Sequence, residues 1–342
     1  MTLVFDKPDA IDSPALAPAH ADVERRAEHR PELTIGLINN MPDSALKSTE
    51  RQFSRLLQAA AGNVRVRFHC FTLRSVQRSP SARGHVDRDY RDIADLGRLP
   101  IDGLIVTGAE PVARTLPEEP YWRELTEVID WARSHTRSTI WSCLAAHAAV
   151  LHLDGIERHR LPRKCSGIYD CAGVVDHWLT RGVPAPLKVS HSRLNELRES
   201  ELAASGYQVL TRSELAGVDV FVRRGPGRFI FFQGHPEYDA LSLQREYMRD
   251  VARFLSGERD DYPPMPAGYF DAGTETVLAG FERRARAGRE PTLAAELPGL
   301  TLRPDLAAGR AATILFRNWL GFLAERVTAA ARRGAAGGGS EG

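Results

Sequence analysis

The feature that most constrains the fold is a repeated alternation between short apolar runs and amphipathic segments. Residues 33–39, 101–106 and 138–142 are apolar runs of strand length. Such runs are typical of strands that are buried on both faces of a sheet. Apolar residues at helical spacing occur within 49–60 and 122–132. Strands that alternate with helices predict an α/β fold, with a mostly parallel sheet covered by helices on both faces.

Further elements are expected in the second half of the chain. Residues 218–223 and 229–232 are two apolar runs joined by a connection that contains Gly and Pro, which predicts a hairpin. Residues 241–255 and 313–327 have the apolar spacing of amphipathic helices. The sheet is therefore expected to carry an added hairpin and a C-terminal helix.

The ends of the chain differ in composition from its body. Residues 1–31 are rich in Ala, Pro, Asp, His and Arg and lack periodicity, and 330–342 end in a Gly-rich run. Segments of this composition bury little apolar surface. We expect a flexible arm over 1–31, a single α/β domain over 32–329 and a disordered tail over 330–342.

Composition excludes several classes of function. The formal net charge is +1, so the chain lacks the basic excess of a nucleic-acid-binding protein. No apolar run approaches the roughly 18 residues of a membrane-spanning helix. Residues 1–31 contain no apolar h-region, so we expect no secretory signal. The four cysteines form neither a C-x-x-C pair nor a zinc pattern. We expect a cytoplasmic protein with no metal, no nucleic-acid partner and no membrane partner.

One cysteine stands where an apolar strand gives way to an Ala-rich helix. Cys143 follows the run 138–142 and precedes Leu144. The positive end of a helix dipole favours a thiolate, and the next amide can stabilise an oxyanion. This position favours a nucleophile, although many buried cysteines are purely structural.

Two other segments fall at strand ends, where open α/β sheets bind their ligands. His235 and Glu237 directly follow the expected strand 229–232, and a thiol nucleophile needs a base and a group that orients the base. An ordinary surface loop is the alternative. Gly108 and Ala109 follow 101–106, and their amides, with that of Leu144, form an expected oxyanion hole. A plain turn fits these two residues equally well.

Beyond these positions, the chain from about 33 to 327 resembles the homoserine O-acyltransferases of the class I glutamine amidotransferase-like superfamily. The matching segments, in order, are IGLINNMP (35–42), TERQFSRLL (49–57), DGLIVTGA (102–109), STIWSCLAAHAAV (138–150), KCSGIYD (164–170), HSR (191–193), GHPEYDA (234–240) and FRNWL (316–320). The resemblance implies a flavodoxin-like, doubly wound sheet. It also implies a ping-pong reaction in methionine biosynthesis: Cys143 takes an acyl group from acyl-CoA and passes it to a small hydroxy amino acid, with His235 as base and Glu237 as its partner. Acyl-CoA is a co-substrate, and no separate cofactor is implied.

The same resemblance implies substrate contacts by Lys164, Ser192 and Arg249, and a homodimer. A cation suits an amino-acid carboxylate, and arginine can bind it through two hydrogen bonds. At the family position that helps select the acyl donor this chain has Val112, where acetyl-CoA users tend to carry glutamate. Valine favours succinyl-CoA, whereas the nearby Glu110 keeps acetyl-CoA open.

Three rival functions remain at the level of sequence. One is acylation of L-serine in place of L-homoserine. Another is a glutamine amidotransferase or related amidohydrolase with the same three catalytic groups, although its usual G-x-C-x-G elbow is replaced here by Trp141-Ser142-Cys143-Leu144-Ala145. A non-enzymatic binding protein on the same fold is the third.

Overall fold

The computed structural model describes residues 3–5, 31–225, 228–297, 300–303 and 308–337. Its strands form one ten-stranded sheet in the order β1-β3-β2-β4-β5-β10-β9-β8-β6-β7. The bounds of the strands are β1 Leu3–Phe5, β2 Glu32–Ile38, β3 Arg65–Phe71, β4 Gly103–Val106, β5 Ser138–Ser142, β6 His159–Gly173, β7 Leu187–Glu196, β8 Tyr207–Ser213, β9 Gly217–Arg223 and β10 Phe229–Phe232.

The first half of the sheet is parallel, as the alternation of strands and helices predicts. The pairings β1 with β3, β3 with β2, β2 with β4, β4 with β5 and β5 with β10 are all parallel. Counted along the chain from β2, these strands lie in the order 2-1-3-4-5, which is the flavodoxin-like order. The expected doubly wound α/β fold is confirmed.

The second half of the sheet is antiparallel and larger than the single expected hairpin. That hairpin is present as β9 and β10. Strand β9 then pairs with β8, β8 with β6 and β6 with β7, all antiparallel. Strand β6 is polar and half-exposed, so it lacks the apolar run that marks a buried strand.

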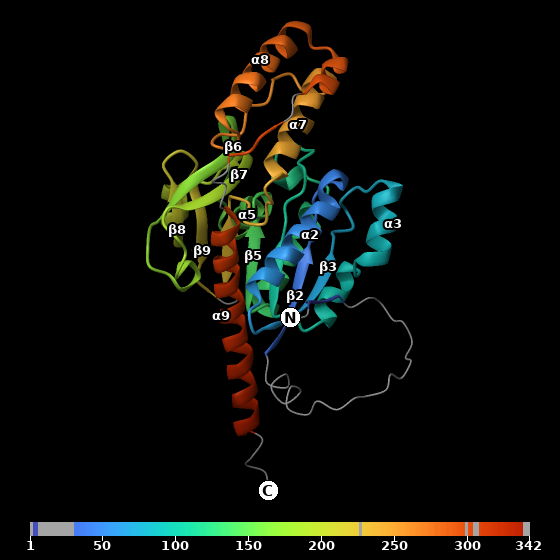
Figure 1. Ribbon diagram of the computed structural model, residues 1–342. Coiled ribbons are helices and arrows are strands. Elements are labelled where there is room, and N and C mark those ends of the chain that lie inside the picture. The colour runs from blue at the N-terminus through green and yellow to red at the C-terminus, as the bar shows by residue number, and fades with distance from the viewer. Residues whose placement is uncertain (1–2, 6–30, 226–227, 298–299, 304–307, 338–342) are drawn as a thin grey trace, which may run out of the picture.

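Helices cover both faces of the sheet, and a further pair extends beyond it (Figure 1). The helices have these bounds: α2 Asp43–Ala60, α3 Pro80–Asp89, α4 Trp122–His135, α5 Leu144–Asp154, α6 Glu199–Ala204, α7 Ser242–Leu255, α8 Ala272–Gly288 and α9 Ala308–Gly337. The 3-10 helices are η1 Ile93–Arg98, η2 Leu116–Glu118, η3 Trp178–Thr180 and η4 Pro291–Glu296.

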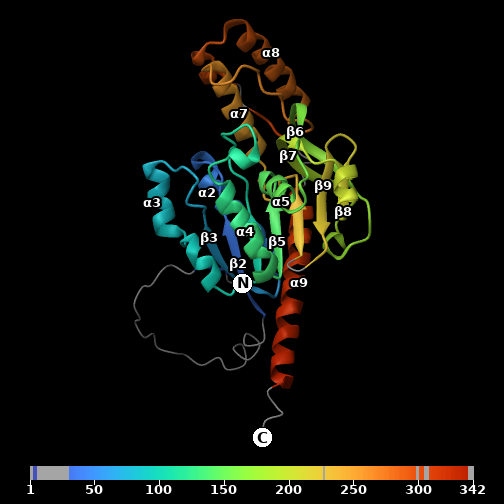
Figure 2. The same cartoon turned by 180° about the vertical axis from the view of Figure 1, so that it is seen from behind.

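Each face of the sheet has its own hydrophobic core. On one face, side chains of β2 pack with Phe53 of α2 and with Phe316 and Trp319 of α9. On the other face, β4 and β5 pack with α4 and α5, which Figure 2 shows from behind. Both strand faces are therefore buried, which is why these strands read as continuous apolar runs.

Helices α7 and α8 stand beyond the carboxyl ends of the parallel strands (Figures 1 and 2). They share a separate hydrophobic core that includes Tyr247, Phe254, Leu278 and Phe281. The apolar residues that α7 contributes to this core recur at helical spacing. The helix expected over 241–255 is confirmed. The face of α7 that is turned to the sheet is polar and contributes to the cavity described below.

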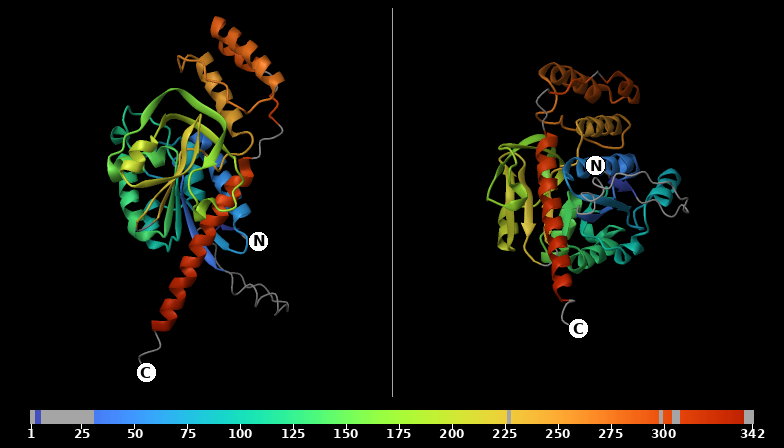
Figure 3. Two further views of the ribbon diagram at one scale, coloured as in Figure 1. Left: turned by 90° about the vertical axis from the view of Figure 1, so that its left-hand side faces the viewer. Right: turned by 60° about the horizontal axis from the view of Figure 1, so that its bottom comes forward.

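The two ends of the chain differ from expectation where the structure describes them. Within the expected arm 1–31, Leu3–Phe5 form strand β1, while 6–30 lie outside the described residues. Helix α9 was expected over 313–327 but continues to Gly337, through much of the expected tail 330–342. The run of Ala and Arg after position 328 has high helix propensity, which outweighs the glycines as far as 337. Helix α9 runs across one face of the sheet, where the parallel and antiparallel halves meet (Figure 3).

Candidate active site

Cys143 occupies a sharp turn between β5 and α5. Its φ is 51° and its ψ is −111°, a region that non-glycine residues rarely adopt. The backbone is held there by hydrogen bonds: Cys143 N donates to the Phe232 carbonyl at 2.7 Å, and Ala146 N donates to the Cys143 carbonyl at 3.0 Å. Such strain costs about 1–3 kcal/mol and gathers at functional sites. The turn presents the thiol at the carboxyl end of the sheet, as expected.

His235 and Glu237 leave the sheet beside Cys143, because β10 and β5 are neighbours and Phe232 pairs with Ser142. His235 N donates to the Ser190 carbonyl at 2.8 Å, which fixes the loop against β7. The Glu237 carboxylate lies 2.8 Å from His235 Nδ1. The imidazole also shares a hydrogen bond with the Cys143 side chain. Since Glu237 occupies Nδ1, Nε2 is the ring nitrogen left to exchange a proton with the thiol.

The environment of His235 favours its charged form. Burial lowers the pKa of the imidazole, but the charges of Glu237 and Cys143 and the hydrogen bonds to both outweigh it and raise that pKa well above its ordinary value. His235 and Glu237 are both buried, and the ring of His235 stacks on Tyr238 with centroids 4.2 Å apart. The arrangement suits an imidazole that cycles between neutral base and imidazolium.

The segment after β4 closes over the start of α5. A Cβ built on Gly108 would lie 2.4 Å from Leu144 Cβ and 3.2 Å from Leu144 N, so only glycine permits this approach. In the described part of the chain, the amides of Gly108, Ala109 and Leu144 donate to no protein acceptor. The structure brings these three residues together beside Cys143, with their N–H groups available to an oxyanion.

A cavity of about 670 Å³ opens at Cys143. Its lining includes Cys143, His235 and Glu237 together with Gly108, Ala109 and Leu144. The volume lies within the range of small-molecule sites. Among the described residues, no group of three or more His, Cys, Asp and Glu side chains is arranged to hold a metal ion.

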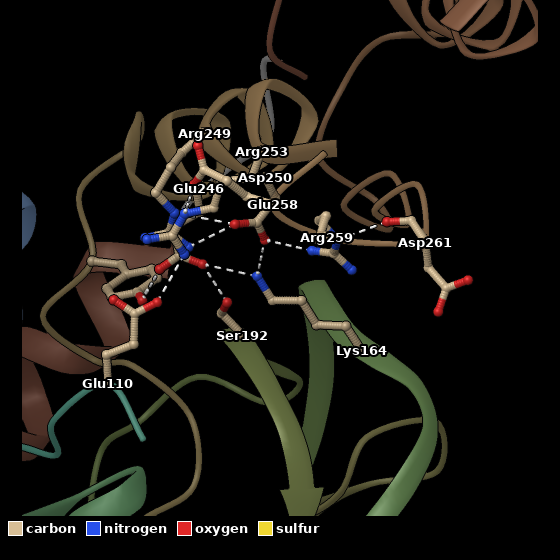
Figure 4. Close-up of polar contacts among 11 residues, drawn as sticks. Glu110, Lys164, Ser192, Glu246, Arg249, Asp250, Arg253, Glu258, Arg259 and Asp261 are labelled. Carbon is tan, nitrogen blue, oxygen red and sulfur yellow. Dashed lines mark hydrogen bonds and ion pairs between the residues drawn. The ribbon is translucent and has the colours of Figure 1, made fainter. Parts of the chain in front are cut away.

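The three expected substrate contacts meet on one wall of the cavity, where α7 faces β6 and β7 (Figure 4). Lys164 Nζ lies 2.9 Å from Asp250 and 3.5 Å from Glu246. Ser192 Oγ donates to Glu246, and Arg249 donates to Asp250 at 2.9 Å. Cations and carboxylates therefore alternate across this wall, a pattern that fits a zwitterionic amino acid.

Two carboxylates of this wall, Glu246 and Asp250, were not expected from the sequence. Burial alone would raise the pKa of Glu246, but Lys164 and the hydrogen bonds from Ser192 and Tyr238 hold that pKa below its ordinary value. The positions 246, 249, 250 and 253 recur at the spacing of one helix face, and all four line the cavity. Charged residues on one face of an otherwise amphipathic helix are usually solvated, so this signal is weak without the fold.

Of the two residues expected to select the acyl donor, one lines the cavity and the other does not. Glu110 lines the cavity, and its carboxylate binds Arg253 at 2.8 Å. Val112 is 76% exposed and is absent from the lining, although its neighbours Pro111 and Ala113 are part of it. The loop turns the Val112 side chain outward because Val112 N and Ala113 N donate to the buried Glu119 carboxylate at 3.1 and 3.0 Å.

Another histidine, His147, lines the cavity on α5, four residues after Cys143. It is buried, and its Nε2 lies 3.1 Å from Gln233 Oε1. Burial and the nearby Arg193 lower its pKa to about 3, so the ring stays neutral. His147 therefore packs beside the site, and His235 is the better placed base.

The chain is similar over nearly its whole length to known proteins. The family model described as "Homoserine O-succinyltransferase" matches residues 6–330. The homoserine O-succinyltransferase of Bradyrhizobium japonicum is 65% identical over 326 residues, covering 95% of this chain and 100% of that protein. The enzyme of the same name from Rhodopseudomonas palustris is 58% identical, covering 95% and 99%. A solved glutamine amidotransferase from Thermotoga maritima aligns with 86% of this chain and 98% of its own at 12% identity and a TM-score of 0.47. The chain belongs to the homoserine O-succinyltransferase family.

Proposed function

We propose that this chain transfers the succinyl group of succinyl-CoA to the hydroxyl of L-homoserine, through a thioester on Cys143, as a step of methionine biosynthesis. The observation that carries the proposal is the arrangement of Cys143, His235 and Glu237 at the mouth of one cavity in a member of this family. A thiol, a base and an orienting carboxylate are the groups that acyl transfer through a covalent intermediate needs.

In the first half-reaction, His235 Nε2 accepts the thiol proton and the Cys143 sulfur attacks the thioester carbonyl carbon. The amides of Leu144 and of Gly108 or Ala109 donate to the oxyanion that forms. The carbon–sulfur bond to CoA then breaks, and His235 returns the proton to the departing CoA thiolate. Glu237 balances the charge of the imidazolium throughout and fixes the ring.

In the second half-reaction, the homoserine hydroxyl attacks the acyl carbon on Cys143. His235 accepts the hydroxyl proton, the same amides stabilise the second oxyanion, and the carbon–sulfur bond to Cys143 breaks. The proton passes to the Cys143 sulfur, which restores the free enzyme and leaves an ester. One thioester is exchanged for another and then for an ester, so neither ATP nor a metal is required.

The charged wall of the cavity supports a zwitterionic acceptor. The acceptor carboxylate is assigned to Arg249 and Lys164, and its ammonium to Glu246, which Ser192 and Tyr238 hold in place by hydrogen bonds. Each charge of the amino acid then meets an opposite, partly buried charge. This assignment predicts that removing Arg249 raises the KM for the acceptor more than the KM for the donor.

A matrix of two donors and two acceptors tests the function: succinyl- and acetyl-CoA against L-homoserine and L-serine. CoA thiol release gives the rate, and mass spectrometry identifies the ester. We expect succinyl-CoA with homoserine to be the best pair. Ester formation only with acetyl-CoA or only with serine contradicts the proposal, and ammonia release from glutamine without acyl transfer would favour an amidohydrolase.

We further propose a homodimer in the cytoplasm, as the family resemblance implies. Light scattering coupled to size exclusion measures the oligomeric state, and a monomeric mass at micromolar concentration contradicts the dimer. No helix among the described residues has the length and apolar character needed to cross a bilayer.

A further inference from the structure

Arg158 is a cation of the cavity to which the reaction described above gives no role. It lines the same cavity as Cys143, and it interacts electrostatically with Cys143, Tyr121 and Glu119. Its Nη1 is shielded from solvent and has no hydrogen-bond partner among the described residues. A buried, unpaired guanidinium nitrogen is costly and calls for an explanation.

The other cavity cations near the acceptor wall are already engaged. Lys164 and Arg249 bind Asp250, and Arg253 binds Glu110. Arg158 differs because Glu119, a carboxylate with which it interacts electrostatically, accepts hydrogen bonds from Val112 N and Ala113 N instead. In the described chain, Arg158 therefore keeps its hydrogen-bonding capacity for a ligand.

Tyr121, which interacts electrostatically with Arg158, lies outside the cavity lining and does not neutralise the guanidinium charge. The hydroxyl of Tyr121 is buried and unbonded among the described residues, and Tyr121 and Arg158 interact electrostatically. Burial raises the pKa of Tyr121, so its hydroxyl keeps its proton and remains a donor. Tyr121 is therefore uncharged, and the charge of Arg158 is left for an anionic ligand in the cavity.

We propose that Arg158 binds the terminal carboxylate of the donor's succinyl group. The proposal rests on the proposed function and extends it to donor recognition. In succinyl-CoA two methylene groups separate the reacting carbonyl from the free carboxylate, so that carboxylate stays close to Cys143 during attack. The CoA phosphates lie at the far end of the long pantetheine arm, which makes them a poorer match for a cation beside the nucleophile. Arg158 would then select the donor from inside the cavity, whereas the Val112 side chain lies outside it.

Donors that differ only at the acyl end test this assignment. Succinyl-CoA is compared with butyryl-CoA, which has a methyl group in place of the carboxylate, and with acetyl-CoA. Thiol release in the absence of acceptor measures the acylation half-reaction. For Arg158→Gln we expect kcat/KM for succinyl-CoA to fall about 10- to 100-fold, the range for a lost hydrogen bond to a charged group, with butyryl-CoA changed by less than about threefold.

Two more variants separate recognition from folding. Tyr121→Phe removes an unbonded hydroxyl outside the cavity lining and keeps the buried ring, so we expect unchanged thermal stability and an unchanged donor ratio. Arg158→Lys should recover part of the kcat/KM for succinyl-CoA, because lysine keeps the positive charge but lacks the paired N–H donors of a guanidinium. Arg163→Gln is the matched control: Arg163 is exposed on β6, lies outside the cavity lining and should leave the donor ratio unchanged.

The outcomes are distinguishable. A selective loss with succinyl-CoA supports the assignment. An equal loss with all three donors overturns it, because Arg158 would then act on the CoA phosphates, on Cys143 or on the fold. No loss in Arg158→Gln also overturns it. If the wild-type chain transfers no acyl group to homoserine, the proposed function itself fails; if it transfers only acetyl groups, the carboxylate site falls as well.

Discussion

Glu237 is the residue whose charge most directly supports the imidazolium form of His235. In Glu237→Gln the amide keeps a hydrogen bond to the ring but loses the charge that raises the His235 pKa. The limb of the pH–rate profile that reports His235 should therefore move to lower pH. We expect kcat/KM near neutral pH to fall by about 10²- to 10³-fold, as for other orienting carboxylates.

The exposed Glu214→Gln, far from the cavity lining, is the control for this change and should keep the wild-type profile. Steady-state rates over a pH series measure both variants. A Glu237→Gln profile that keeps its midpoint would show that the carboxylate does not support the charge of His235.

Asp219 makes a second prediction at the residue scale. It is buried beneath the catalytic loop, accepts from Gly234 N at 3.3 Å and lies 3.7 Å from His191. Burial raises its pKa from 3.8 to about 6. The folded protein therefore holds this proton more tightly than the unfolded chain does. The contribution of Asp219 to the free energy of unfolding is fully present below the pKa of the unfolded chain, about 4. It is lost as the pH rises through the folded-state pKa of about 6.

Asp219→Asn should abolish this dependence. Relative to wild type, the free energy of unfolding of the variant should rise by about 1–2 kcal/mol between about pH 5 and about pH 8. Urea unfolding at both pH values measures it. A constant difference between the two proteins would mean that Asp219 titrates normally in the folded state.

At the scale of elements, the segment after β4 meets the start of α5 at the residues proposed for the oxyanion site. Gly108→Ala forces a Cβ to within 2.4 Å of Leu144 Cβ, so one of the two segments must move. We expect kcat to fall by about 10²-fold or more, which is the usual cost of losing one oxyanion donor. Gly173→Ala is the matched control, because a Cβ there meets nothing within 4 Å. Equal effects of the two substitutions on kcat would contradict a special role for the approach of Gly108 to Leu144.

At the scale of the whole molecule, α9 packs against both halves of the sheet. Trp319 is fully buried between α9 and β4, and its Nε1 donates to Ser138 Oγ at 3.0 Å. Trp319→Ala should lower the free energy of unfolding by about 3–5 kcal/mol, through lost burial and the cavity left behind. Thermal or urea unfolding measures the change, and Arg317→Ala, exposed on the same helix, should stay within about 0.5 kcal/mol of wild type. A loss as large in Arg317→Ala would indicate general weakness of α9.

The sequence predicts the parallel half of the sheet well, because β2, β4 and β5 are buried on both faces and read as continuous apolar runs. Strand β6 was not predicted, because the sequence of a half-exposed strand with polar residues resembles that of a loop. The residues of the candidate site likewise divide into those that the sequence predicts and those that only the structure reveals. Cys143, His235 and Glu237 stand at strand ends that the fold must bring together. Glu246, Asp250 and Arg158 are recognised only through their burial and partners, which depend on how α7, β6 and β7 meet.

The most direct test of a thioester on Cys143 is the mass of the intact chain after incubation with succinyl-CoA and no acceptor. We expect the mass gain of one succinyl group, located on the peptide that contains Cys143, and its disappearance when L-homoserine is added. Cys143→Ala should show no gain. An active wild-type preparation in which Cys143 stays unmodified, or in which a succinylated Cys143 does not discharge to homoserine, would contradict the covalent mechanism.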